Sequence, residues 1–185
     1  MNRSGALVLM LLGMVTAGAV TGGAEPAATR TPAAWRSYDM LVEFRALPRA
    51  YACDELWYKV RDVLLQLGAR AYMTITPYDC GAQSGAKARS PSVEVKFQLP
   101  QPLAGPATRY AETTVSERAI RLAPGSPGSL QARDCELMRQ LQETLLAGLP
   151  VRVAGASFSC TAAAKTFALT VDAPIAAHGS ATPRS

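Results

Sequence analysis

Residues 53–80 read CDELWYKVRDVLLQLGARAYMTITPYDC, and residues 135–160 read CELMRQLQETLLAGLPVRVAGASFSC. Each stretch begins with a cysteine beside carboxylates, continues through leucines at helical spacing to a glycine, and then enters a strand that ends on a second cysteine. Aligning Cys80 with Cys160 also aligns Leu65 with Leu145, Gly68 with Gly148 and Tyr78 with Phe158. This internal similarity predicts a fold built from two similar halves.

The hydrophobic pattern around each stretch predicts the same order of elements. The first half is expected to contain a strand at 38–47, a helix at 53–67 that Gly68 ends as a C′ glycine, and strands at 71–76 and 93–99. The residues expected to face the core are Leu56, Val60, Val63, Leu64 and Leu67 of the helix and Val93, Val95, Phe97 and Leu99 of the last strand. The second half is expected to contain a strand at 113–122, a helix at 134–147, a strand at 151–158, and a last strand with Phe167, Leu169 and Val171 on its inward face. This strand–helix–strand–strand order resembles half of a ferredoxin-like split βαβ unit.

The sequence therefore predicts an α+β fold, a tandem βαββ repeat with ferredoxin-like halves. A right-handed crossover makes the first two strands of each half parallel, with the third strand antiparallel between them. Each half alone is too small to bury a good core. We therefore expect one antiparallel or mixed sheet with two helices on one face.

Composition along the chain divides it further. The expected parts are a signal peptide at 1–24, a flexible N-terminal segment at 25–36, a first βαββ half at 37–100, a connection at 101–112, a second βαββ half at 113–172, and a disordered tail at 173–185.

The first 24 residues have the pattern of a secretory signal peptide. Arg3 provides the positive charge, an apolar run follows at 6–15, and small residues precede a cleavage site that we place after Ala24, with Ala19 as the alternative. The apolar run is shorter than the ~20 residues of a membrane span. We expect an exported protein, periplasmic or secreted, with no integral membrane segment after cleavage.

Four cysteines in an exported chain predict two disulfides. In each half, one cysteine begins the helix and the other follows the next strand, and these positions lie at the same end of a parallel strand pair. The predicted structural disulfides are therefore Cys53–Cys80 and Cys135–Cys160, each worth about 3–4 kcal/mol on a chain-entropy estimate. A thiol-disulfide redox role is the alternative, because a helix N-terminus lowers a thiol pKa.

The residues available for chemistry are few. His178 is the single histidine and lies in the expected tail, and no nucleotide or cofactor motif is present, so we expect no cofactor, no metal site and no catalytic residues. Acidic residues flank both disulfides: Asp54, Glu55 and Asp79 at one, and Asp134 and Glu136 at the other. They are interpreted as helix-end charges, with Asp134 as an N-cap. A carboxylate-dependent hydrolase is the alternative.

The remaining features favour protein binding. The net charge is +5, but lysines and arginines are scattered, which does not predict nucleic-acid binding. On the first helix, Trp57 lies at the flank of the apolar face and Tyr58 is turned partly outward, so the pair is a candidate partner surface. The alternative is that the two rings close the edge of the core. The predicted function is a non-catalytic, protein-binding or accessory module whose partner is another envelope protein. The sequence specifies neither that partner nor an oligomeric state.

Overall fold

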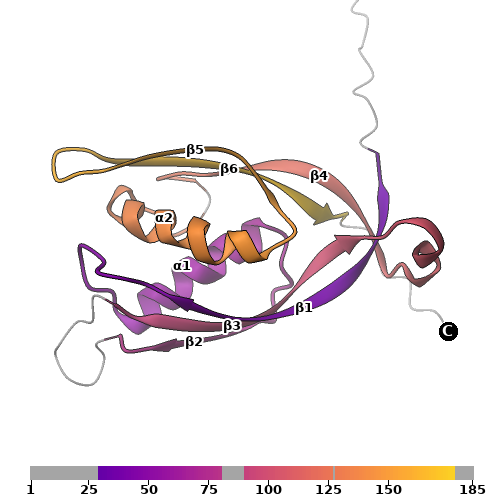
Figure 1. Cartoon of the computed structure of the whole chain (residues 1–185), viewed down its shortest axis with the longest axis horizontal. Coiled ribbons are helices and arrows are strands. Elements are labelled where there is room, and N and C mark those ends of the chain that lie inside the picture. The colour runs from indigo at the N-terminus through magenta and orange to yellow at the C-terminus, as the bar shows by residue number, and fades with distance from the viewer. Residues whose placement is uncertain (1–28, 81–89, 127, 178–185) are drawn as a thin grey trace, which may run out of the picture.

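The computed structural model describes residues 29–80, 90–126 and 128–177 (Figure 1). The predicted signal peptide, most of the loop after Cys80, and His178 lie outside the described residues. Within these three ranges, no helix has both the length and the apolar character needed to cross a bilayer.

Regular elements cover most of the described chain. In order they are β1 (Thr31–Glu43), α1 (Cys53–Gln66), β2 (Thr74–Tyr78), β3 (Ser92–Pro102), the 3₁₀ helix η1 (Gly105–Tyr110), β4 (Thr113–Leu122), η2 (Ala132–Asp134), α2 (Cys135–Thr144), η3 (Leu146–Gly148), β5 (Arg152–Cys160) and β6 (Lys165–Ala176).

The fold is α+β, with a single six-stranded sheet in the order β2-β3-β1-β4-β6-β5. All neighbouring strands are antiparallel. Because β1 and β2 both run antiparallel to β3 between them, they share one direction. In the same way β6 lies between β4 and β5. The predicted single sheet is confirmed.

The sheet consists of two three-stranded wings joined by a short seam. β1 pairs with β3 from Ala33 to Glu43, but with β4 only through Thr31, Pro32 and Ala33. Figure 1 shows the wings diverging from this seam, with β2, β3 and β1 on one side, β4, β6 and β5 on the other, and both helices between them. The helices therefore lie on the concave face of one folded sheet.

A single hydrophobic core fills the space between the wings. The apolar faces predicted for both helices are fully buried, and so are the inward residues predicted for β3 and β6. These buried residues are Leu56, Val60, Val63, Leu64, Leu67, Val93, Val95, Phe97, Leu99, Leu137, Leu141, Leu145, Phe167, Leu169 and Val171. Since the cluster includes both wings and both helices, the two halves share one core.

The first strand differs from its prediction at both ends. Thr31 to Arg36, expected in the flexible segment 25–36, belong to β1 because pairing with β3 and β4 orders this backbone and buries Ala33 completely. The strand ends at Glu43 instead of Leu47. Ala46 has a φ of +45°, a left-handed conformation that a strand does not accommodate.

The second half also departs from its predicted bounds. β6 continues to Ala176, inside the tail predicted to be disordered from residue 173, because its pairing with β4 extends to Val115. The second helix is shorter than predicted: α2 ends at Thr144, and the turn that follows is the separate 3₁₀ helix η3.

Candidate functional site

Both predicted disulfides are present. Cys53 bonds to Cys80 and Cys135 to Cys160, with Cα atoms 5.2 and 5.4 Å apart. Cys53 and Cys135 are the first residues of α1 and α2, while Cys80 follows β2 and Cys160 ends β5. Each disulfide therefore ties the N-terminus of a helix to the end of the next strand.

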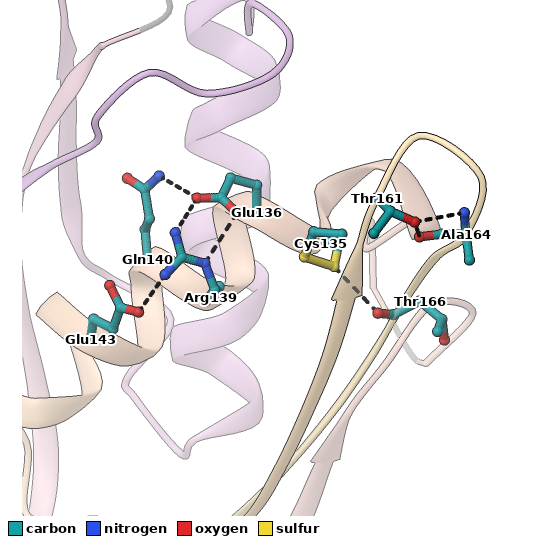
Figure 2. Close-up of a disulfide and its surroundings, with 9 residues drawn as sticks. Cys135, Glu136, Arg139, Gln140, Glu143, Thr161, Ala164 and Thr166 are labelled. Atoms are coloured by element: carbon teal, nitrogen blue, oxygen red, sulfur yellow. Dashed lines mark hydrogen bonds and ion pairs between the residues drawn. A yellow bond between two sulfur atoms is a disulfide. The ribbon is translucent and has the colours of Figure 1, made fainter.

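The surroundings of the second disulfide form a surface ion cluster (Figure 2). Arg139 donates to Glu136 and Glu143, and Gln140 donates to Glu136 over 2.9 Å. The hydrogen bond from Arg139 lowers the pKa of Glu136 despite partial burial. Glu136 is thus an ionised, paired carboxylate and not a proton donor.

A buried ionic network lies where the N-terminal turns of the two helices meet. At its centre is the fully buried carboxylate of Asp134. Its Oδ2 accepts hydrogen bonds from Lys59 Nζ (2.6 Å) and the Gln131 backbone N–H (2.9 Å). Its Oδ1 accepts from Tyr51 Oη and Arg49 Nη2, both at 3.0 Å. Four donors on one carboxylate compensate for its loss of water.

Asp134 lies at the predicted N-cap position of α2, but its carboxylate has a different role. It occupies the position before α2, but its side chain makes no capping bond to that helix. Its carboxylate instead closes a capping box with Gln131 around η2 and turns toward Lys59 of α1. The buried ammonium group of Lys59 competes more strongly for a carboxylate than an exposed backbone N–H does.

The structure groups the acidic residues differently from the prediction, which placed them beside the two disulfides. Glu55 was grouped with one disulfide and Asp134 with the other, but both are ion-paired to Arg49, and Lys59 pairs with Asp134 at 2.6 Å and Glu55 at 3.7 Å. Asp54 lies apart from them, beside Trp57. Asp79 has a φ of +56° in the turn before Cys80.

These contacts set the ionisation of the network. Burial alone would raise the pKa of Asp134, but hydrogen bonds from Lys59, Gln131 and Arg49 outweigh it and lower that pKa. The hydrogen bond from Arg49 lowers the pKa of Glu55. Burial, followed by the negative charge of Asp134, raises the pKa of Tyr51. Asp134 and Glu55 are therefore ionised near neutral pH, and Tyr51 is protonated.

Sequence reasoning missed Lys59, although the sequence contains a signal for it. Lys59 stands three residues after Leu56 and four before Val63, on the apolar face of α1. A lysine there must find a buried anion or leave the helix face exposed. The position of Lys59 indicated such a partner, but only the tertiary structure identifies Asp134, 75 residues later.

The predicted partner surface lies on the first turns of α1. The rings of Trp57 and Tyr58 meet edge to face, with centroids 4.9 Å apart and planes at 89°. Tyr58 is 55% exposed and Trp57 is half-buried against the core. Together with Pro77 of β2, Cys53 and Asp54, they line a mostly apolar hollow of about 340 Å³. We call these five residues the aromatic surface.

The aromatic surface is held firmly in place. The Cys53–Cys80 disulfide joins its helix to the end of β2, and Leu56 and Val60 fix the opposite side of that helix in the core. The arrangement suits contact with an apolar side chain of a partner. In the described ranges, no three His, Cys, Asp or Glu side chains gather as a metal-ligand set.

Comparisons with known proteins give no relative: no family model, no curated protein and no solved structure matches this chain.

Proposed function

We propose that this chain is an exported, non-catalytic cell-envelope protein, periplasmic or secreted, that works by binding another protein. Two disulfides and the absence of a membrane-spanning helix in the described ranges are compatible with an extracytoplasmic location. The N-terminal 24 residues support export through their signal-peptide pattern.

The observation that carries the binding proposal is the aromatic surface. Tyr58 exposes more than half of its area beside an apolar hollow, and Trp57 supports it from the core side. Tyrosine and tryptophan are enriched at the centres of protein interfaces because they bury a large area with few rotatable bonds. A rigid aromatic pair on a disulfide-anchored helix loses little entropy on binding.

The ionisation of the acidic residues supports binding over hydrolysis. A carboxylate-dependent hydrolase needs one acid whose pKa is raised, so that it donates a proton near neutral pH. The pKa values of Glu55, Asp134 and Glu136 are instead all lowered by their cationic partners. These carboxylates are suited to fixing structure.

A thiol-disulfide role is less well supported. Cys53 is partly exposed at the start of α1, where a helix dipole would stabilise its thiolate after reduction. However, Asp54 and Glu55 follow it in the same helical turn and oppose a negative sulfur. Cys135 is almost completely buried, which favours a structural role for its bond.

We also infer that the fold is a tandem βαββ repeat. The order of elements is the same in both halves, the last strand of each half lies between the other two, and equivalent disulfides join each helix to the following strand. A repeat of this kind leaves one copy free to diverge toward binding, and the aromatic surface belongs to the first copy.

The test is affinity capture from the extracytoplasmic fraction of the source cells, followed by calorimetry with the purified captured protein. Tyr58→Ala should weaken binding at least about tenfold, the effect expected of a central interface tyrosine. Tyr58 is exposed, so its removal should leave stability within about 0.5 kcal/mol of wild type.

Tyr110→Ala is the matched control. Tyr110 is 64% exposed, lies in η1, and is not part of the aromatic surface. Unchanged affinity in this control, together with weakened binding by Tyr58→Ala, would support the proposal. Equal affinities of wild type and Tyr58→Ala for the captured protein would refute it.

A further inference from the structure

A second surface, independent of the aromatic surface, lies at the C-terminal end of α1. Here β1, β4 and β6 converge (Figure 1), and the side chains between them leave a groove of about 1120 Å³. Its volume slightly exceeds the 300–1,000 Å³ typical of small-molecule sites. We call it the arginine groove, after Arg30, Arg70 and Arg118, which line it.

The charge of the arginine groove is unbalanced. Its lining carries three guanidinium groups but only one carboxylate, that of Glu112. One oxygen of Glu112 accepts a hydrogen bond from the Trp35 backbone N–H over 3.2 Å. Within the described ranges, Arg30, Arg70 and Arg118 form no ion pair. The groove therefore attracts an anion.

One of these arginines is already positioned. The Arg70 guanidinium lies over the Trp35 ring, 4.2 Å from its centroid. Its Nη1 donates to Tyr72 Oη over 2.6 Å and to Gln98 Oε1 over 2.9 Å. A guanidinium held in this way loses little freedom when its remaining N–H groups bind an oxyanion.

The rest of the lining is largely apolar. Ile120 of β4 and Ile175 of β6 are half-buried and pack against the core, and Leu65 of α1 faces the same space. The Trp35 ring adds an aromatic wall. A ligand that satisfies both parts of the lining needs an oxyanion head and an apolar body.

We propose that the arginine groove binds an anionic amphiphile, with its carboxylate or phosphate head at the arginines and its chain over Ile120 and Ile175. Arginine presents paired N–H donors that match the geometry of either oxyanion. This site is separate from the proposed protein contact, because Tyr58 and Trp57 do not line it.

The probe is sodium laurate, titrated below its micelle concentration. The chain contains two tryptophans, and Trp35 lines the groove, so a Trp57→Phe background reports on the groove by fluorescence. Calorimetry gives the stoichiometry. We expect saturable one-to-one binding of laurate and of monododecyl phosphate, with their relative affinities showing which head the groove prefers.

Arg118→Ala is the decisive variant. Arg118 is exposed on β4, so its removal should not unfold the protein, and the loss of a charge-assisted hydrogen bond should weaken laurate binding at least about tenfold. Arg121→Ala is the matched control: it removes the same charge from the same strand, but Arg121 does not line the groove. Its affinity should stay within about twofold of wild type.

Three further ligands test the contributions of the head and of the chain separately. Acetate and inorganic phosphate carry the charge alone, and dodecanol carries the chain alone; each should bind much more weakly than laurate. The proposal fails if laurate does not saturate, if Arg121→Ala weakens binding as much as Arg118→Ala, if dodecanol binds as well as laurate, or if acetate or inorganic phosphate binds as tightly.

Discussion

At the scale of single residues, the buried ion pair of Lys59 with Asp134 makes the fold sensitive to the loss of either charge. Lys59 and Asp134 are 2% and 0% exposed, and their side chains meet at 2.6 Å. A buried pair adds little net stability when intact, because both charges have lost water. Removal of the Asp134 charge would leave the buried Lys59 ammonium with only the Ser129 carbonyl, at 2.9 Å, and the Glu55 carboxylate, at 3.7 Å.

We therefore predict that Asp134→Asn lowers the free energy of unfolding at pH 7 by about 3–5 kcal/mol. The substitution keeps the shape of the side chain but removes the charge opposite Lys59. Urea denaturation with both disulfides intact measures the loss. Glu143→Gln, which removes one side of an exposed pair with Arg139, is the control and should change stability by no more than about 0.5 kcal/mol.

A comparison of wild type with Asp134→Asn over a range of pH gives a second test. The pKa of Asp134 is lowered in the folded protein, so its stabilising effect is complete above the unfolded aspartate pKa of about 3.9 and is lost as pH falls through the lower folded value. The stability difference between wild type and Asp134→Asn should therefore shrink below about pH 4. A stability difference that stays constant on acidification would contradict the conclusion that Asp134 is ionised in the folded protein.

At the scale of elements, the end of α1 depends on Gly68. Its φ is +86°, and an added Cβ would lie 3.0 Å from Ile175 Cδ1. Its amide donates to the Leu65 carbonyl, which ends the helix as the C′ glycine position requires. The sequence predicted this role from the glycine after the last leucine of the helix.

Gly68→Ala should lower the free energy of unfolding by about 1–2 kcal/mol, because a side chain is strained in the left-handed region. Gly155→Ala in β5 is the matched control, since Gly155 has no positive φ and an added Cβ would have no atom within 4 Å. Its stability should stay within about 0.5 kcal/mol of wild type. Equal losses in both variants would show that the conformation of Gly68 does not matter.

The burial of β5 differs from that expected of a half-buried strand. The exposed stretch from Arg152 to Ser157 lacks the alternation of a half-buried strand. β5 is an edge strand, a register shift between Val153 and Gly155 interrupts its pairing with β6, and α2 ends at Thr144. α2 therefore covers only part of the wing formed by β4, β6 and β5.

At the scale of the whole molecule, the two wings are joined by far more than the sheet. β1 and β4 share only three residue pairs, yet the core and the Asp134 network both connect the halves. Each half contributes one helix to the same interior. This shared interior explains why two small βαββ units form one folded sheet and not two separate domains.

The proposed export makes a prediction about the whole chain. Protein recovered from the extracytoplasmic fraction should have the mass of residues 25–185 less four hydrogens, because a leader is removed and two disulfides form. Intact-mass spectrometry without reduction measures both. A soluble pool that retains Met1 would contradict the export proposal, and four free thiols would reopen the redox alternative.

The local features of this protein were predictable from its sequence, because they depend on residues close together in the chain. Hydrophobic periodicity identified the buried faces of α1, α2, β3 and β6, and Gly68 was identified as the end of α1. The disulfide pairing also followed, since the repeat of cysteine, helix, strand and cysteine places both partners at one end of a parallel strand pair.

Only the tertiary structure decided the features that join distant segments. The early start of β1 arises from pairing with β3 and β4, and the late end of β6 from pairing with β4, which neither strand encodes locally. The partner of Lys59 and the arginine groove likewise combine residues from both halves. A sequence pattern records which face of an element is apolar, but the fold of the whole sheet determines which charged groups that face meets.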